Sequence, residues 1–385
     1  MKTVCANILI FLAVVCTSCE GRRESQHPSI DVSRDYPKEE ISWQAIADVE
    51  YVPLAISDDV LLASYDRLFY LSDRFIMIYS ISSGDIYIFS RDGEIISHFN
   101  RQGRGPNEYG MIKDVVFDEN TEEFFVVDIY SSRILVFSLT GKHKRTLTLP
   151  NEWQIKAYNF DKEALLVYDD GGVTAGSFKT MPYHLISKAD GSIIETLHID
   201  MPQRYSNMIF TNNQVYALGL SNNRLGGGKD FTLADISCDT VYRYTREKVL
   251  SPAFVRTPSV HDTEPKTVLT TALVSDRFIV FTITSLDFES SMRGSGFSVR
   301  PLMYDYATGS TTEPVFKNDD YPSLKWDGAY NEIDIPANTF AQILDPLELK
   351  DAHEKGELSG YLRDIAAEIE EDDNPVVMIM RIGGV

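Results

Sequence analysis

The stretch Tyr79–Gly93, YSISSGDIYIFSRDG, returns 48 residues later as Val127–Gly141, VDIYSSRILVFSLTG. The two stretches align without a gap. Each ends in an alternating, strand-like run and then in a turn, with glycine at the position where a positive φ is favoured. We therefore predict that a unit of strand and tight turn is repeated along the chain.

Further copies of the turn extend this repeat. A third turn lies in Lys188–Ile194, 50 residues beyond Gly141. Another lies in Ala307–Gly309, 118 residues beyond Gly191. That last gap equals two periods of 59, and Tyr244–Glu247 falls between the two as a degenerate turn. The spacing predicts that the repeat continues through most of the chain.

A second motif has the same period. The sequence SDRFI at Ser72–Ile76 recurs at Ser275–Ile279, 203 residues away, which is close to four periods of 51. A period near 50 with several short strands matches one blade of a β-propeller, in which small twisted sheets pack in a ring. We predict an all-β, six-bladed β-propeller over residues 46–385, with blade limits near residues 100, 150, 200, 259 and 317.

The C-terminal segment departs from the strand pattern. Asp345–Glu348 has an acid at the N-cap, proline at N1 and glutamate at N3, which predicts the start of a helix. Gly356 and Gly360 are expected to break this helix in two. Val376–Ile382 then has the pattern of a buried strand, and we expect it to pair near Tyr51–Leu54 and close the ring. The fold prediction thus includes a short helical insertion before the last strand.

The N-terminal residues predict export. Lys2 precedes an apolar run, Val4–Val15, that is too short to cross a bilayer as a helix but suits the core of a signal peptide. The small residues before Cys19 resemble the lipobox of bacterial lipoproteins, and this resemblance implies that the Cys19 thiol carries a lipid. We expect a signal peptide over residues 1–18. We expect a flexible tether over 19–45, because that segment is polar and shows no sustained period.

Two alternatives are open for the same segment. Cys16 and Cys19 form a C-x-x-C pair, which elsewhere is a redox or metal-binding motif. The other alternative is a cleaved signal that leaves the protein free of the membrane.

The net charge of the chain limits the partners that we expect. The formal net charge of −21 repels phosphate backbones and anionic lipid headgroups. We therefore expect no nucleic-acid partner. We expect attachment to the membrane through the N-terminal lipid alone, at the cell envelope, on the periplasmic face or the cell surface of the outer membrane.

The second repeat carries a family resemblance. Residues 98–142 resemble an NHL repeat, with a glycine-rich loop, a strand, Val-Asp, a further strand and a glycine turn. Gly103–Tyr109 resembles the G-R-G-P-x-E-Y signature of six-bladed β-propeller lipoproteins of Bacteroides-type bacteria. This resemblance implies the fold and the export, and it implies no established reaction.

The same loop supplies candidate functional residues. They are Arg101, Arg104, Glu108, Tyr109 and, in the following strand, Asp128. We favour a structural role, in which the loop clasps two blades and Asp128 satisfies a neighbouring backbone turn. The functional alternative is that the charged side chains line a mouth of the central channel.

Catalytic motifs are absent from the sequence: it contains no G-x-S-x-G, H-E-x-x-H, P-loop or G-x-G-x-x-G pattern. We therefore favour a non-enzymatic binding or scaffold domain for an envelope protein or a glycan. The alternative is a metal-dependent hydrolase or lyase acting in the central channel. Asp118–Asn120 and Asp169–Asp170 are candidates for Ca²⁺, but neither has a full binding-loop spacing, so we assign no metal ligands.

Overall fold

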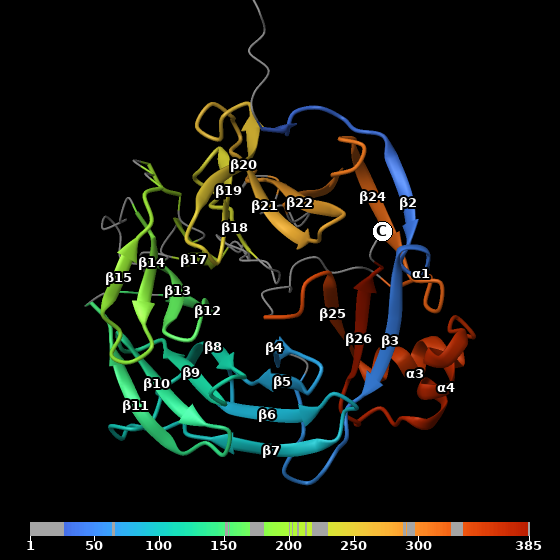
Figure 1. Ribbon diagram of the computed structural model, residues 1–385. Helices are drawn as coiled ribbons and strands as arrows, with labels where there is room; N and C mark the ends of the chain where they lie inside the picture. Colours follow the sequence, from blue (N-terminus) through green and yellow to red (C-terminus); the bar gives the residue numbers. More distant parts are fainter. Residues whose placement is uncertain are drawn as a thin grey trace, which may run out of the picture.

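The computed structural model describes residues 27–383, with gaps at 64–65, 151–152, 154, 170–180, 200, 202, 206–207, 212–213, 218–229, 288–289, 291–296 and 325–333. The predicted signal peptide and Cys19 lie outside the described residues. The strands form six blades around a central axis, as predicted (Figure 1). No helix in the described part is both long and apolar enough to span a membrane.

Blades 1 to 3 are four-stranded antiparallel sheets whose strand order follows the chain. Blade 1 contains β4 (Arg67–Leu71), β5 (Phe75–Tyr79), β6 (Asp85–Ser90) and β7 (Ile95–Asn100). Blade 2 contains β8 (Ile112–Asp118), β9 (Glu123–Asp128), β10 (Arg133–Ser138) and β11 (His143–Thr148). Blade 3 contains β12 (Ile155–Asn159), β13 (Ala164–Asp169), β14 (Tyr183–Ser187) and β15 (Ile193–Thr196).

Blades 4, 5 and 6 each pair with one strand from the N-terminal segment, which are β1 (Ser29–Asp31), β2 (Lys38–Ser42) and β3 (Ala47–Pro53) in that order. Blade 4 contains β18 (Phe231–Leu233), β19 (Thr240–Tyr244) and β20 (Leu250–Thr257), and it follows the hairpin of β16 (Met208–Thr211) and β17 (Gln214–Ala217). Blade 5 contains β21 (Thr267–Val274), β22 (Phe278–Ser285), β23 (Ser298–Asp305) and β24 (Thr311–Lys317). Blade 6 contains β25 (Thr339–Leu344), β26 (Val376–Ile382) and β3 (Ala47–Pro53). The last strands of blades 1 to 5 end at residues 100, 148, 196, 257 and 317, within four residues of the predicted limits.

The glycine turns explain the repeat. Gly93, Gly141, Gly191 and Gly309 each lie between the third and fourth strands of a blade, with φ between +67° and +88°. The degenerate turn of blade 4 places Lys248 there instead, with φ +63°. The turn position therefore requires a left-handed backbone in five blades, and glycine adopts it with the least strain.

Both copies of the SDRFI motif form the same turn. The Ser72 hydroxyl accepts hydrogen bonds from the amides of Arg74 and Phe75, between the first two strands of blade 1. Ser275 does the same for the amides of Arg277 and Phe278 in blade 5. The two copies lie four blades apart, as their spacing predicts.

Pairing of the two ends of the chain closes the ring. β3 and β26 are antiparallel, with Pro53 opposite Val376 and Ala47 opposite Ile382. This confirms the predicted closure. Because the closing sheet combines strands from both ends of the chain, opening the ring requires breaking that ladder of hydrogen bonds.

The predicted helical insertion is confirmed between β25 and β26. It consists of α3 (Pro346–Glu354) and α4 (Gly360–Glu368). The Asp345 carboxylate caps α3 by accepting from the amides of Leu347 and Glu348, at 2.9 and 3.3 Å. Gly356 ends the first helix with φ +71°. The buried side chains of the insertion join the core of blades 5 and 6, and they include Leu349, Leu358, Leu362 and Ile365.

The predicted tether is wrong for residues 29–45. β1 (Ser29–Asp31) pairs in parallel with β20, and β2 (Lys38–Ser42) pairs in parallel with β24. The short helix α1 (Trp43–Ile46) follows, and the Trp43 ring stacks on Phe316 at 4.4 Å. We call residues 29–46 the N-terminal strap. It is ordered because the outer edges of blades 4 and 5 offer unpaired backbone groups, and because Ile30, Ile41 and Trp43 are buried.

Candidate functional site

A polar cavity of about 400 Å³ lies at one mouth of the central channel. Figure 1 shows that β4, β8, β12 and β25 are the innermost strands, and most of the lining comes from their ends or from the turns that follow them. The lining residues are Tyr70, Arg74, Glu119, Asn120, Asn159, Arg246 and Asp334. Four of the six blades and the segment before β25 therefore contribute to one site.

Two hydrogen bonds fix the carboxylate of Glu119 in this cavity. The Tyr70 hydroxyl donates to Glu119 Oε2 at 2.6 Å, and Arg74 Nη1 donates to Glu119 Oε1 at 3.4 Å. Burial raises the pKa of Tyr70, and its hydrogen bond to Glu119 raises that pKa further. Tyr70 therefore stays a donor at neutral pH. Since a carboxylate has about four acceptor positions, Glu119 keeps capacity for a ligand.

A buried lysine supports the turns beneath the cavity. Lys188 Nζ donates to Asp118 Oδ2 at 2.7 Å, to Asn159 Oδ1 at 2.6 Å and to the Asp161 carbonyl at 2.5 Å. The side chains of Lys188 and Asp118 are 5% and 1% exposed. Lys188 therefore joins the first turns of blades 2 and 3 and holds Asn159 in position.

Arg246 reaches the cavity from the turn between β19 and β20. Its Nη1 donates to the carbonyl of Asn159 at 2.8 Å and also to that of Phe160. Its guanidinium carbon lies 4.4 Å from the centre of the Phe231 ring. Within the described part of the chain, no other group bonds the remaining N–H groups of Arg246. The guanidinium is thus held in place with donors available to a ligand.

Asp334 supplies a second carboxyl group. Its amide donates to the Phe69 carbonyl at 2.9 Å, and its carbonyl accepts from the amide of Leu71 at 3.0 Å, so its backbone is fixed against β4. Burial raises the pKa of Asp334 to about 6, although Arg246 and Lys188 act in the opposite direction. The cavity therefore contains a carboxyl group that takes up a proton just below neutral pH.

We expect Asp334→Asn to change how stability depends on pH. An aspartate in the unfolded chain ionises near pH 3.9. Between that value and about pH 6 the folded protein holds a proton that the unfolded chain has lost, so stability from protonated Asp334 falls as the pH rises through this window. Urea unfolding at pH 4.5 and 7.5 should show the variant gaining stability relative to the wild type at the higher pH. An unchanged difference at the two pH values would contradict the assignment.

The predicted loop residues lie at the other end of the channel wall. β8 begins at Ile112, directly after the loop, and ends at Asp118, beside the cavity. Asp128 pairs with Ile112, so it also lies at the far end. A seven-residue strand spans about 20 Å. The structure therefore does not bring Arg101, Arg104, Glu108, Tyr109 or Asp128 into the cavity.

Tyr109 and Arg101 instead connect blades 1 and 2. The buried Tyr109 hydroxyl donates to the Gly84 carbonyl at 2.7 Å and accepts from the Arg101 amide at 2.9 Å. Arg101 Nε donates to the Gly141 carbonyl at 2.7 Å. The Tyr109 ring packs edge-on against Phe137 in the core between these blades.

The other loop residues have local contacts. Glu108 Oε2 accepts from the Gly105 amide at 2.8 Å, while Arg104 is exposed. Asp128 accepts from the Ser131 hydroxyl at 2.7 Å and from the Tyr130 amide at 3.2 Å. These bonds stabilise the loop and the turn after β9.

Two sequence signals pointed toward the cavity. Arg74 belongs to the repeated SDRFI motif, and Glu119 and Asn120 belong to the acidic turn considered for Ca²⁺. Asp118 of that turn is bound by Lys188. In the described part of the chain, no group of three or more His, Cys, Asp or Glu residues could hold a metal ion. Of the second candidate pair, Asp169 is buried and Asp170 lies outside the described residues.

The closed ring with a polar cavity at one mouth defines a six-bladed β-propeller with a candidate ligand site. A family model described as "Domain of unknown function (DUF4934)" matches residues 27–381, and the chain belongs to this family. The search of curated proteins returned no match.

One solved structure shares the fold, and a second is less similar. A protein from Bacteroides fragilis described as a "putative exported protein" is 16% identical, with a TM-score of 0.63, and the match covers 90% of this chain and 99% of that one. A member of the DUF4221 family from Bacteroides vulgatus is 8% identical, with a TM-score of 0.45, and the match covers 88% and 98%. At 16% identity, the first likeness concerns the fold alone.

Proposed function

We propose that this protein is an exported, lipid-anchored propeller of the cell envelope that binds a hydroxyl-rich ligand, such as a glycan unit, at its channel mouth. The lipobox-like sequence before Cys19 supports the anchor. The fold likeness to the Bacteroides fragilis protein described as exported supports the location.

The composition of the cavity carries the proposal. Arg74, Arg246 and Asn120 offer donors, while Glu119 and Asp334 offer acceptors. A sugar hydroxyl both donates and accepts, so it can bond to both kinds of group at once. The volume of about 400 Å³ lies within the range of small-molecule sites. A recessed cavity of this size suits a small ligand or a chain end better than a flat protein surface.

The charges of the cavity and of the whole chain favour a neutral ligand. The cavity has two arginines and two acids, which balance locally, while the whole chain has a net charge of −21. A polyanionic glycan is therefore repelled on approach. A neutral saccharide meets no such barrier and can use every polar group of the cavity.

Calorimetric titration of the mature chain with neutral oligosaccharides tests this function. We expect Glu119→Gln to weaken binding by about 10- to 100-fold, because a hydrogen bond to a charged group contributes about 1.5–3 kcal/mol. Glu122→Gln is the matched control, because Glu122 bonds the same Arg74 but does not line the cavity.

Two results would contradict the proposal. One is that no neutral saccharide binds. The other is that Glu122→Gln weakens binding as much as Glu119→Gln. Repeated cleavage of a bound saccharide would instead identify a hydrolase or lyase.

A further inference from the structure

The place where the chain enters the propeller is fixed at the outer rim of blade 4. The Pro28 carbonyl accepts a hydrogen bond from the amide of Val255, in β20, at 3.0 Å. The Val32 amide then donates to the Thr257 carbonyl at 2.8 Å. β20 is the last strand of its blade, so β1 lies on the outside of the ring (Figure 1).

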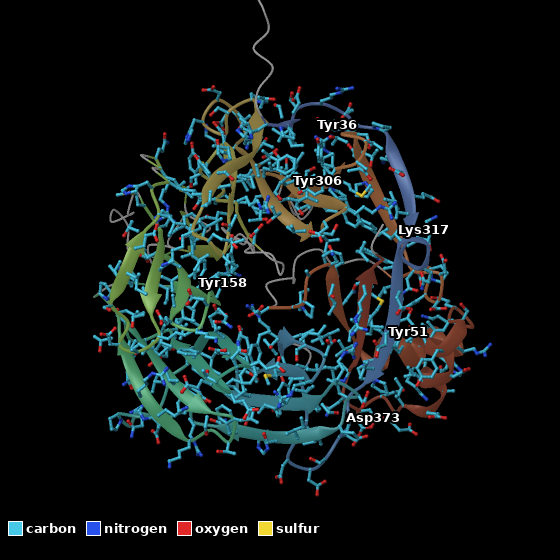
Figure 2. The ribbon with its side chains drawn as sticks, in the orientation of Figure 1. Tyr36, Tyr51, Tyr158, Tyr306, Lys317 and Asp373 are labelled. Carbon is cyan, nitrogen blue, oxygen red and sulfur yellow. The ribbon has the colours of Figure 1, made fainter. Side chains whose placement is uncertain are left out.

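The strap is fastened at several further points along blade 5. Arg300, in β23, donates to the carbonyls of Val32 and Arg34 at 2.9 and 2.7 Å. Lys317 forms an ion pair with Glu40 at 2.7 Å. Figure 2 labels Tyr36 of the strap and Lys317 of β24 on this side of the ring. The exit point at Pro28 therefore stays with the folded domain.

The chain between Cys19 and Pro28 is short compared with the domain. Nine residues span at most about 30 Å even when fully extended. A compact domain of this length is about 50 Å across. If Cys19 carries a lipid, the ring cannot stand on its far rim while the strap is in place, because Pro28 would then lie about 50 Å from the bilayer.

We infer that the propeller is held edge-on at the bilayer, with the rim of blades 4 and 5 facing the lipid and blade 1 directed away from it. This inference rests on the lipid anchor of the proposed function. In this orientation the channel axis runs along the membrane surface. The cavity at the channel mouth opens sideways, within reach of ligands that move along the envelope.

Two single-cysteine reporters test the orientation in the full-length, membrane-attached protein. Asp35→Cys places a label on the strap, and Glu94→Cys places one on the exposed outer turn of blade 1, across the ring. Both variants are made with Cys238→Ser, which removes the free thiol found among the described residues. Energy transfer from each label to acceptor lipids in vesicles reports its distance from the bilayer.

We expect the label at position 94 to lie farther from the bilayer than the label at position 35 by about 30 Å or more. Equal energy transfer at the two positions would overturn the edge-on orientation. Membrane fractionation of Cys19→Ala distinguishes this failure from failure of the anchor, with Cys16→Ala as the control. Release of Cys19→Ala alone supports the anchor, and continued sedimentation of that variant overturns the anchor and this inference together.

Discussion

Replacement of Gly93 by alanine is expected to destabilise the propeller by about 3 kcal/mol or more. Gly93 has φ +88°, which is a strained conformation for any residue with a Cβ atom. An added Cβ would lie 2.2 Å from the Pro53 carbonyl oxygen and 3.1 Å from Val52 Cγ1. Those atoms belong to the end of β3, the strand that closes the ring, so the substitution would displace the closing sheet.

Gly309→Ala is the matched control for this prediction. Gly309 occupies the corresponding turn of blade 5 with φ +67°. A Cβ there would lie 3.6 Å from the Tyr304 hydroxyl oxygen, which is an ordinary contact. We expect the free energy of unfolding of this variant to fall by only about 1–2 kcal/mol, which is the cost of a left-handed backbone for a residue with a Cβ atom. Urea unfolding of both variants measures the difference, and equal losses would show that contact with β3 is unimportant.

Lys188→Met is expected to lower the free energy of unfolding by about 3–5 kcal/mol. The substitution leaves the buried Asp118 carboxylate without its cation and removes the bonds to Asn159 and Asp161. A buried charge that has lost its partner is far less stable than the same charge in water. Because the lysine supports the turns beneath the cavity, we also expect saccharide binding to weaken.

Lys144→Met provides the control, and a double variant isolates the charge. Lys144 pairs with Glu123 but is 42% exposed, so its loss should cost less than about 1 kcal/mol. Lys188→Met combined with Asp118→Asn removes both charges and should recover part of the stability lost by Lys188→Met alone. If the double variant is no more stable than the single one, the uncompensated Asp118 charge is not the cause of the loss.

The candidate site was only partly predictable. Arg74 and Glu119 lie in turns that the sequence made conspicuous, one by repetition and one by its acids. Arg246 lies in the turn that departs most from the repeat, and Asp334 has no local motif. Hydrogen bonds and ring packing bring these residues together from distant parts of the chain, and such contacts leave no pattern of adjacent residues.

The blade period, the number of blades, the ring closure and the helical insertion all follow from patterns in the sequence. These features depend on local chemistry, because a left-handed turn selects glycine, an N-cap selects aspartate, and a buried strand has its own apolar pattern. Tertiary structure was needed to show that the N-terminal strap pairs, through β1 and β2, with the open edges of blades 4 and 5. It also decided that the Gly103–Tyr109 loop lies at the end of the channel opposite the cavity. Edge pairing sets the first outcome, because it depends on which distant backbones meet. The second depends on where the cavity forms, because the loop precedes β8 and the cavity lies where that strand ends.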